Sequence, residues 1–306
     1  ALAQPDLNLP IHLVSFFGHY GVPVFLFLSA YGLVLKYGRS LYAPAFRFVA
    51  YHWKKLFSMM IVGFVSFTIV DAMTPGRWHY TLTQVVAQLA MVNNLLPDPD
   101  HNIWPGPFWF FGLMLQLYVV YRLLLYKRHW AWTAGAMVVC LGVQLAFAPE
   151  SEALNWYRSD FMGGMLPFGL GLLYARYGNR IILTNLNTLS LLVSVVFCGF
   201  MVMWMSASYL LWSVVPLVVC VLCVYVVKLL SQAARRPVGA WLMERLVWMG
   251  EISAALFVIH PVLRKVFIPI SRHGDIYTGL LLYAIAAIGA AWLIRLVMTK
   301  IPKPQM

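Results

Sequence analysis

The sequence carries little charge for its length. Only 10% of its 306 residues are Asp, Glu, Lys or Arg, whereas 62% are hydrophobic. A soluble domain has about 25% charged residues because its surface faces water, so this composition excludes an ordinary soluble domain. The mean hydropathy of +0.77 agrees with that exclusion. Because the apolar runs are continuous and do not alternate as in a β-barrel, we predict an all-α, polytopic bundle of transmembrane helices.

Cysteines and the common catalytic motifs are also scarce. The sequence has no GxSxG elbow, no HExxH, no P-loop and no acidic pair inside an apolar run, which disfavours peptidase, redox and ATP-driven pump functions. The few cysteines all lie within apolar runs, so we interpret them as packing residues and expect neither a disulfide nor a metal site. They are Cys140, Cys198, Cys220 and Cys223.

Nine apolar runs are candidates for membrane spans, since a helix needs roughly 20 such residues to cross a bilayer. They are residues 15–35, 57–73, 105–126, 130–148, 161–176, 183–205, 208–229, 247–268 and 277–298. A weaker amphipathic segment, Thr81–Leu96, is predicted to form an interfacial or re-entrant helix. The sequence shows no repeat and no soluble domain, so we predict that residues 1–306 form a single membrane-embedded domain.

Lys and Arg are unevenly distributed between the two sets of loops that these spans create. One set holds most of the 22 basic residues, and the other holds most of the ten acids. Cytoplasmic loops carry the excess of basic residues, so we predict that the first set and the C-terminus are cytoplasmic. The net charge of +12 then requires no nucleic-acid partner. Since Ala1 would lie outside, we expect one further span before it, which makes ten.

Polar residues near membrane depth point to function, because each is costly in lipid unless it is paired or hydrated. At the start of the second span, "YHWKKLF" places His52, Lys54 and Lys55 close to Arg47. One interpretation is a positive-inside anchor, and the other is a cationic mouth for a phosphate-bearing cytoplasmic ligand. Both interpretations stay open at this point.

A second polar group lies in "WPGPFWFFGLMLQLYVVY", where Trp109, Gln116 and Tyr118 share one span. Trp109 suits an aromatic belt at the membrane surface. Gln116 lies in the middle of the span, where its amide needs up to about four hydrogen bonds. We predict that it either joins helices or contacts a ligand.

A third group lies in "GEISAALFVIHP", where Ser253 and His260 are two helical turns apart and share one face. His260 is either a structural hydrogen-bonding residue or a base that takes and returns a proton.

In "GVPVFLFLSAYG", Ser29 is in mid-span beside Ala30 and Gly32. Small residues of this kind allow helices to approach closely.

In this order, the motifs resemble those of the acyltransferase-3 family of bacterial integral-membrane acyltransferases. "GVPVFLFLSAY" is similar to the family's G-V-x-x-F-F-x-x-S-G-[FY]. "HWKKLFS" is similar to R-x-x-R-[IL]-x-P, with His52 and Lys55 in place of the arginines. "WFFGLMLQLYVVY" is similar to W-F-L followed by Q-F-Y, and "GEISAALFVIHPVL" to G-x-I-S-x-x-[IL]-[YF]-x-[IL]-H-x-P.

The resemblance implies an acyltransferase-like domain of the O-acetyltransferase type in a bacterial plasma (inner) membrane. It implies transfer of an acyl group, most often acetyl, from cytoplasmic acyl-CoA to a hydroxyl of an envelope glycan or exopolysaccharide, without a metal. The residues expected to bind the CoA phosphates are Arg47, His52, Lys54 and Lys55. Those expected to line the substrate site are Ser29, Trp109, Gln116, Tyr118 and Ser253.

His260 is the candidate catalytic base within this sequence. The family's proposed base is a histidine of its first span, with an arginine about ten residues earlier in the family pattern, and no position here matches either one. This agrees with the further span that we expect before Ala1. Two other functions stay open, namely a transporter or flippase for a glycan or lipid intermediate and a catalytically inactive membrane assembly partner. The acceptor, the acyl chain length and the oligomeric state are not predicted.

Overall fold

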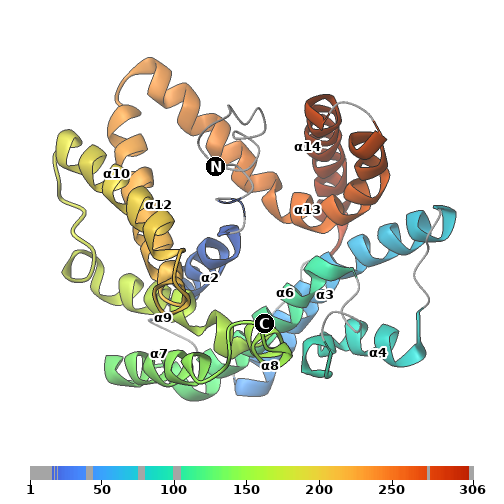
Figure 1. The fold of residues 1–306 in the computed structure, drawn as a ribbon, viewed down its shortest axis with the longest axis horizontal. Helices are drawn as coiled ribbons and strands as arrows, with labels where there is room; N and C mark the ends of the chain where they lie inside the picture. The colour runs from blue at the N-terminus through green and yellow to red at the C-terminus, as the bar shows by residue number, and fades with distance from the viewer. Residues whose placement is uncertain are drawn as a thin grey trace. The chain divides into compact units, whose positions relative to one another are not determined.

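The computed structural model describes residues 16, 18, 20–38, 44–74, 80–98, 105–273 and 276–302. Within this part of the chain all regular secondary structure is helical, which confirms the predicted all-α class (Figure 1). The long helices are α2 (Gly21–Tyr37), α3 (Ala45–Met73), α6 (Trp109–Val120), α7 (Trp130–Leu145), α9 (Phe161–Tyr177), α10 (Thr188–Met205), α12 (Val215–Ala233), α13 (Pro237–His273) and α14 (Ile276–Lys300). Each of them overlaps one of the predicted spans.

Short elements join these helices. They are α4 (Leu82–Ala90), α8 (Glu152–Ser159), α11 (Tyr209–Trp212), the 3₁₀ turns η1 (Asn93–Leu95), η2 (Gly106–Phe108) and η4 (Gly178–Arg180), and the π-helical turn η3 (Tyr121–Leu125). Six helical stretches of the described chain are long and apolar enough to cross a membrane, by length and composition. They are residues 45–73, 106–125, 188–205, 215–233, 237–267 and 277–300, and α2 and α7 are shorter apolar helices.

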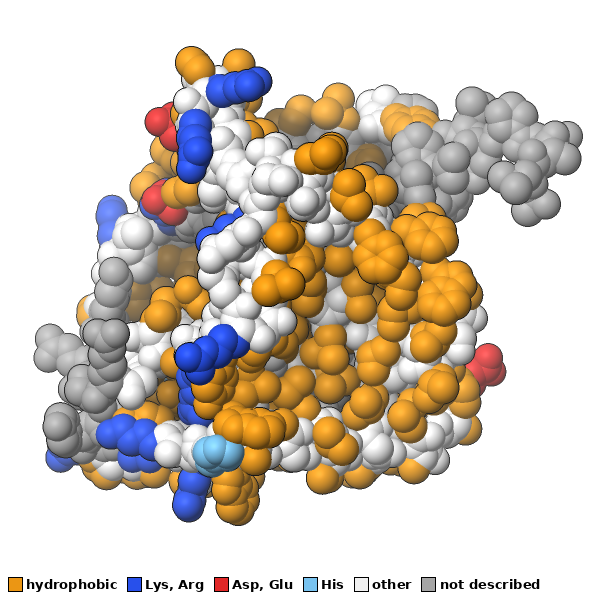
Figure 2. Space-filling view, turned by 90° about the vertical axis from the view of Figure 1, so that its left-hand side faces the viewer, with side chains coloured by type: hydrophobic (Ala, Val, Ile, Leu, Met, Phe, Trp, Pro, Cys, Tyr) orange, Lys and Arg blue, Asp and Glu red, His pale blue; other side chains and the backbone are white. Residues whose placement is uncertain are grey.

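Large apolar side chains are exposed along these helices. On α10, for example, Phe197, Phe200 and Trp204 are each more than half exposed. Apolar side chains also cover a large part of the face shown in Figure 2. Monomeric soluble proteins rarely expose apolar patches larger than a few hundred Å², whereas a lipid-facing surface is apolar by requirement. The structure therefore describes a polytopic membrane bundle.

The chain divides into two compact units, which are described separately. Unit 1 contains Ala1–Leu41, Leu124–Leu154 and Met162–Arg235, and unit 2 contains Tyr42–Leu123, Asn155–Phe161 and Arg236–Met306. The prediction that residues 1–306 form one domain stays a prediction.

In unit 1, α2, α9, α10 and α12 share apolar clusters, one of them around Phe27 and Cys220. Gly171 of α9 lies so close to α2 that a Cβ there would overlap the Phe27 carbonyl oxygen and come within 2.9 Å of the Ala30 Cβ. The small residue Ala30 therefore allows a close helix approach, as predicted. Polar side chains add links, such as the hydrogen bond of 3.1 Å from Gln144 Nε2 to Ser213 Oγ.

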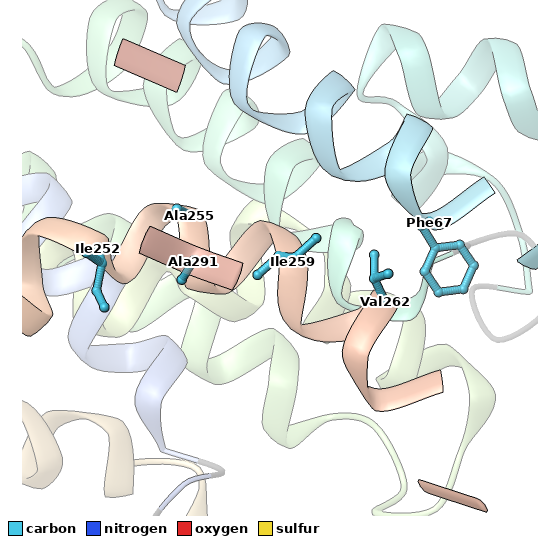
Figure 3. Close-up of a cluster of buried hydrophobic side chains, with 6 residues drawn as sticks. All are labelled: Phe67, Ile252, Ala255, Ile259, Val262 and Ala291. Atoms are coloured by element: carbon cyan, nitrogen blue, oxygen red, sulfur yellow. The ribbon is translucent and has the colours of Figure 1, made fainter. Parts of the chain in front are cut away.

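In unit 2, α13 packs against α14 and α3. The apolar core between them is shown in Figure 3 and consists of Phe67, Ile252, Ala255, Ile259, Val262 and Ala291. Gly63 is a point of close approach between α3 and its neighbours. A Cβ at Gly63 would lie 2.7 Å from the Val258 carbonyl oxygen of α13 and 2.8 Å from the Phe108 ring. Phe108 thus fixes the start of α6 against the middle of α3.

A buried ion pair between Asp71 and Lys265 joins the C-terminal parts of α3 and α13. The Asp71 side chain is only 1% exposed and that of Lys265 is 17% exposed. Tyr80 also donates a hydrogen bond of 3.5 Å to Asp71 Oδ2. The two residues are 194 positions apart, so the sequence alone did not reveal the pair. Because a carboxylate at this depth is costly when it is alone, the pair accounts for its presence there.

Several element boundaries differ from their predictions, and α13, for example, begins at Pro237, before the predicted 247. The predicted continuous helix Thr81–Leu96 is wrong in its second half, because α4 ends at Ala90 and Met91 adopts a left-handed conformation with φ of 58°. Asn93 then accepts a hydrogen bond from the Asn94 backbone, a local bond that competes with helix formation. α3 begins at residue 45, before the predicted 57, because the charged side chains of its first turns lie on an exposed side. The predicted span 208–229 is interrupted between α11 and α12.

We expect Lys265→Ala to lower the free energy of unfolding by about 3–5 kcal/mol, because it leaves the buried Asp71 carboxylate without its cation. Arg295→Ala is the matched control, since Arg295 forms an ion pair of 2.7 Å with Glu251 in which the side chains are 34% and 50% exposed. That change should cost about 1 kcal/mol or less. Reversible unfolding in mixed detergent micelles measures both values. Equal losses for the two variants would contradict a buried pair.

Candidate functional site

Three of the four predicted phosphate-binding cations share an exposed region of α3. Arg47, Lys54 and Lys55 are all exposed. Arg47 and Lys54 are seven residues apart, which is close to two helical turns, so they lie almost in line along the helix. Lys55 is next to Lys54. The first half of α3 therefore presents a row of positive charges, which we call the cationic row.

His52, the fourth of these residues, lies elsewhere. At about 100° per residue, the five positions from Arg47 turn it about 140° around the helix axis. It is buried, and its ring centroid lies 4.4 Å from that of Phe48 and 4.3 Å from that of Tyr118. Tyr121 lies next to Phe48, at 6.1 Å. We call Phe48, His52, Tyr118 and Tyr121 the aromatic cluster.

The aromatic cluster joins α3 to α6. It brings together His52, predicted for the donor phosphates, and Tyr118, predicted for the substrate site. Aromatic pairs at such distances contribute about 0.5–1.5 kcal/mol beyond their buried area, so the cluster holds the two helices in register. The contact of His52 with a phosphate stays a prediction.

The other predicted residues of unit 2 lie on α6 and α13. Trp109 begins α6, half-buried, with its ring 6.3 Å from that of Phe110. Ser253 donates to the carbonyl of Gly250 at 2.7 Å, within its own helix. His260 Nδ1 lies 2.7 Å from the carbonyl oxygen of Phe257. A carbonyl only accepts, so Nδ1 carries the hydrogen and Nε2 of the neutral ring keeps a lone pair, as a base requires.

Ser29 lies half-buried on α2, in unit 1. Gln116 and His260 belong to unit 2. The predicted substrate site that combines these three residues therefore stays a prediction.

Gln116 holds the start of α9 against α6. Its Nε2 donates a hydrogen bond of 3.0 Å to Asp160 Oδ1, and its Oε1 accepts one of 2.8 Å from the backbone N–H of Phe161. This arrangement matches the predicted joining role. The amide still has a second N–H, for which no partner is recorded among the described residues.

Other buried amides surround this contact. Asn94 is fully buried, and its Nδ2 donates to the Ser159 carbonyl at 2.8 Å. Asn93 Nδ2 donates to Gln88 Oε1 at 2.6 Å, and Gln88 Nε2 lies 3.1 Å from the Met60 sulfur. We call Gln88, Asn93, Asn94, Gln116 and Asp160 the polar cluster.

The segment from α4 to η1 packs along α3, and both the re-entrant and the interfacial alternative stay predictions. Tyr80, before α4, contacts Asp71 and Phe64 of α3, whereas Gln88 in its last turn contacts Met60. Met60 is eleven residues before Asp71, which is about 16 Å along a helix. The segment thus follows α3 from its C-terminal end towards its middle, and the chain then turns at Met91. Buried irregular backbone requires polar partners, and the polar cluster supplies them.

Sequence analysis did not identify Gln88, Asn93, Asn94 or Asp160 as site residues. The available signal was the presence of amides in the apolar stretch "VVAQLAMVNNLL" and of an acid directly before a predicted span. Amides in a weak helix are common on exposed surfaces, so the signal did not reveal that these side chains are buried.

Asp160 lies between α8 and α9, outside the membrane-spanning segments, and its side chain is buried. Burial raises the pKa of this carboxyl above its ordinary value, and the hydrogen bond from Gln116 opposes the rise. None of the salt bridges within the described residues involves Asp160. Its charge is therefore stabilised by an amide and not by a cation.

Comparison with known proteins identifies the family of this multi-pass membrane protein. A profile of the acyltransferase-3 family, described as an acyltransferase domain, matches residues 2–296. The chain belongs to this family, and it is a membrane acyltransferase by that membership. Searches of the curated proteins and of the solved structures give no significant match.

We expect Gly112→Ala to destabilise the protein by about 1–3 kcal/mol through overpacking. A Cβ at Gly112 would overlap Asn94 Oδ1 and come within 3.0 Å of the Met91 carbonyl oxygen. Gly106→Ala is the control, because a Cβ there meets nothing within 4 Å. Thermal unfolding in lipid nanodiscs measures both variants. If Gly112→Ala is as stable as Gly106→Ala, α6 and the segment from Met91 to Asn94 are not in close contact.

Proposed function

We propose that the protein transfers an acyl group, acetyl in the simplest case, from cytoplasmic acyl-CoA to a hydroxyl of an envelope glycan. The observation that carries this proposal is the cationic row of Arg47, Lys54 and Lys55, in a chain of an acyltransferase family. Acyl-CoA bears several phosphates, and cationic side chains bind phosphate through charge-assisted hydrogen bonds. The charge bias of the loops supports a bacterial plasma membrane location with the row and the C-terminus in the cytoplasm.

The cationic row suits the nucleotide end of the donor. Arg47 offers a planar fork that binds two phosphate oxygens together, whereas Lys54 and Lys55 act as point charges on flexible stems. All three are exposed, so a soluble donor reaches them directly. His52 is the predicted fourth contact, and its buried position makes it the residue that links this region to α6 through the aromatic cluster.

The chemistry that we propose is direct acyl transfer without a metal. The acceptor oxygen forms a bond to the thioester carbon, the π electrons move to the carbonyl oxygen, and a histidine takes the hydroxyl proton. His260 is the candidate base within the described residues. The intermediate then re-forms its C=O bond and expels the CoA thiolate with the electrons of the C–S bond, and the thiolate takes up the proton from the histidine.

The acceptor is proposed to approach from the other end of unit 2. Amides and a carboxylate are the groups that bind sugar hydroxyls, and the polar cluster contains both. Ser29, Trp109, Tyr118 and Ser253 are proposed as further substrate contacts. Lipid and a glycan are the only partners that this function requires, and nucleic acid is not among them.

We expect Arg47→Ala, Lys54→Ala and Lys55→Ala each to weaken binding of acetyl-CoA about three- to tenfold, as about 0.6–1.4 kcal/mol per exposed charge contact requires. Isothermal titration calorimetry of the protein in nanodiscs measures this affinity. Lys228→Ala on α12 is the matched control, since it also removes an exposed lysine from a loop set predicted to be cytoplasmic. It should leave the affinity unchanged.

Two results would contradict the proposal. The first is that the protein in its native membrane does not bind acetyl-CoA, which would support the transporter or inactive-partner alternative. The second is that all four variants weaken binding equally, which would make the cationic row a membrane anchor and not a donor site.

A further inference from the structure

We infer that Asp160 is a positioning residue that holds the Gln116 amide so that its second N–H donates to the acyl oxygen during transfer. This inference rests on the proposed function and adds two residues with defined roles to it. It depends on how hydrogen-bond donors and acceptors are distributed around one side chain.

The orientation of the Gln116 amide is fixed from two sides. An ionised carboxylate only accepts hydrogen bonds and a backbone N–H only donates. Asp160 Oδ1 at 3.0 Å therefore faces Nε2, and the Phe161 N–H at 2.8 Å faces Oε1. A rotation of the amide by 180° would place oxygen against carboxylate and N–H against N–H. Such a rotation loses both bonds, so the amide has one stable orientation.

This orientation leaves one donor unused. A glutamine amide has two N–H bonds, and only one of them is directed at Asp160. Gln116 itself is half-buried, whereas Asp160 is buried, so the amide that carries the remaining donor is the less buried partner of the contact. A donor fixed in advance, in a site with little water, is what stabilises a developing oxyanion most effectively.

The surroundings of Asp160 support a specific role for its charge. α6 carries no charged residue, and its one titratable side chain is Tyr118 of the aromatic cluster. The facing η1 region contributes the neutral Asn93 and Asn94. On α8, Tyr157 is buried and Arg158 is exposed, and the titratable residues of α9 lie at its opposite end. A carboxylate kept buried without a cation is costly, and a neutral Asn would join the helices equally well.

Protonation of Asp160 should remove the constraint. The neutral carboxylic acid can donate as well as accept, so the rotated amide regains a partner. Because burial raises the pKa of this carboxyl, the change occurs at a higher pH than for an ordinary Asp. The folded state then binds the proton more tightly than the unfolded state does. Ionisation of Asp160 therefore lowers the free energy of unfolding as pH rises from the unfolded-state pKa to the folded-state pKa. Activity should increase as pH rises, because the ionised carboxylate orients the Gln116 amide.

The experiment compares wild type with Asp160→Asn, which is the isostere of the protonated carboxyl. We expect Asp160→Asn to fold with at least the stability of wild type and to lower kcat about tenfold or more, with an unchanged KM for acetyl-CoA. Release of CoA thiol from acetyl-CoA, with cellohexaose or alginate oligosaccharide as acceptor and water as the baseline, measures the rate. Wild type should lose activity at acidic pH, and the variant should lack that dependence.

A second variant tests whether Asp160 acts through Gln116. Gln116→Met keeps the side-chain length but removes the donor, and it should lower kcat at least as much as Asp160→Asn. The double variant should be no slower than Gln116→Met alone, because both changes remove one function. Gln144→Met in unit 1 is the control, since it removes a buried glutamine that bonds Ser213 and should leave kcat unchanged.

An independent readout follows the carboxyl itself. Infrared difference spectra between acidic and neutral pH should contain a carboxylic acid C=O band that is absent in Asp160→Asn. The inference is overturned if Asp160→Asn keeps the wild-type kcat and pH profile, or if the two single variants have additive effects. Absence of acetyl-CoA binding in wild type would instead overturn the proposed function.

Discussion

Satisfaction of buried polar groups is the constraint on which this structure depends. In the protein interior no bulk water is available for an unpaired amide or charge, so each must find a partner within the protein. Asp71 finds Lys265, Asp160 finds Gln116, and Asn94 finds the Ser159 carbonyl. These contacts connect segments that are far apart in the sequence, and they hold the η1 region and the residues just before α9 against the long helices of unit 2.

The same constraint separates stabilising from functional polar residues. The Asp71–Lys265 pair has charges of opposite sign and needs nothing further to be stable. The Asp160–Gln116 contact instead joins a carboxylate to an amide, and it uses only one of the two N–H donors of Gln116. The cationic row differs from both, because its charges are exposed and cost little to maintain. In the proposed function, donor binding and acyl transfer thus use residues in very different environments.

Helix periodicity explains how much of the site was accessible to prediction. Arg47 and Lys54 lie on one side of α3 because they are seven residues apart, and this could be derived from spacing. His52 was grouped with them by its charge type, although the same spacing turns it towards α6. The partner of His52 could not be derived, since Tyr118 comes from a helix that begins more than fifty positions later. Asp160 was missed because its burial depends on the fold and not on its neighbours in sequence.

The sequence by itself determined the helical class, the approximate positions of the long helices and the family, because apolar runs and short motifs are local properties of the chain. Only the tertiary structure decided that α4 turns back at Met91, that Gln116 faces Asp160, and that His52 packs among aromatic rings. The physical reason is that a side chain's partner is set by packing between distant segments. Periodicity limits which face it occupies, but not what lies opposite.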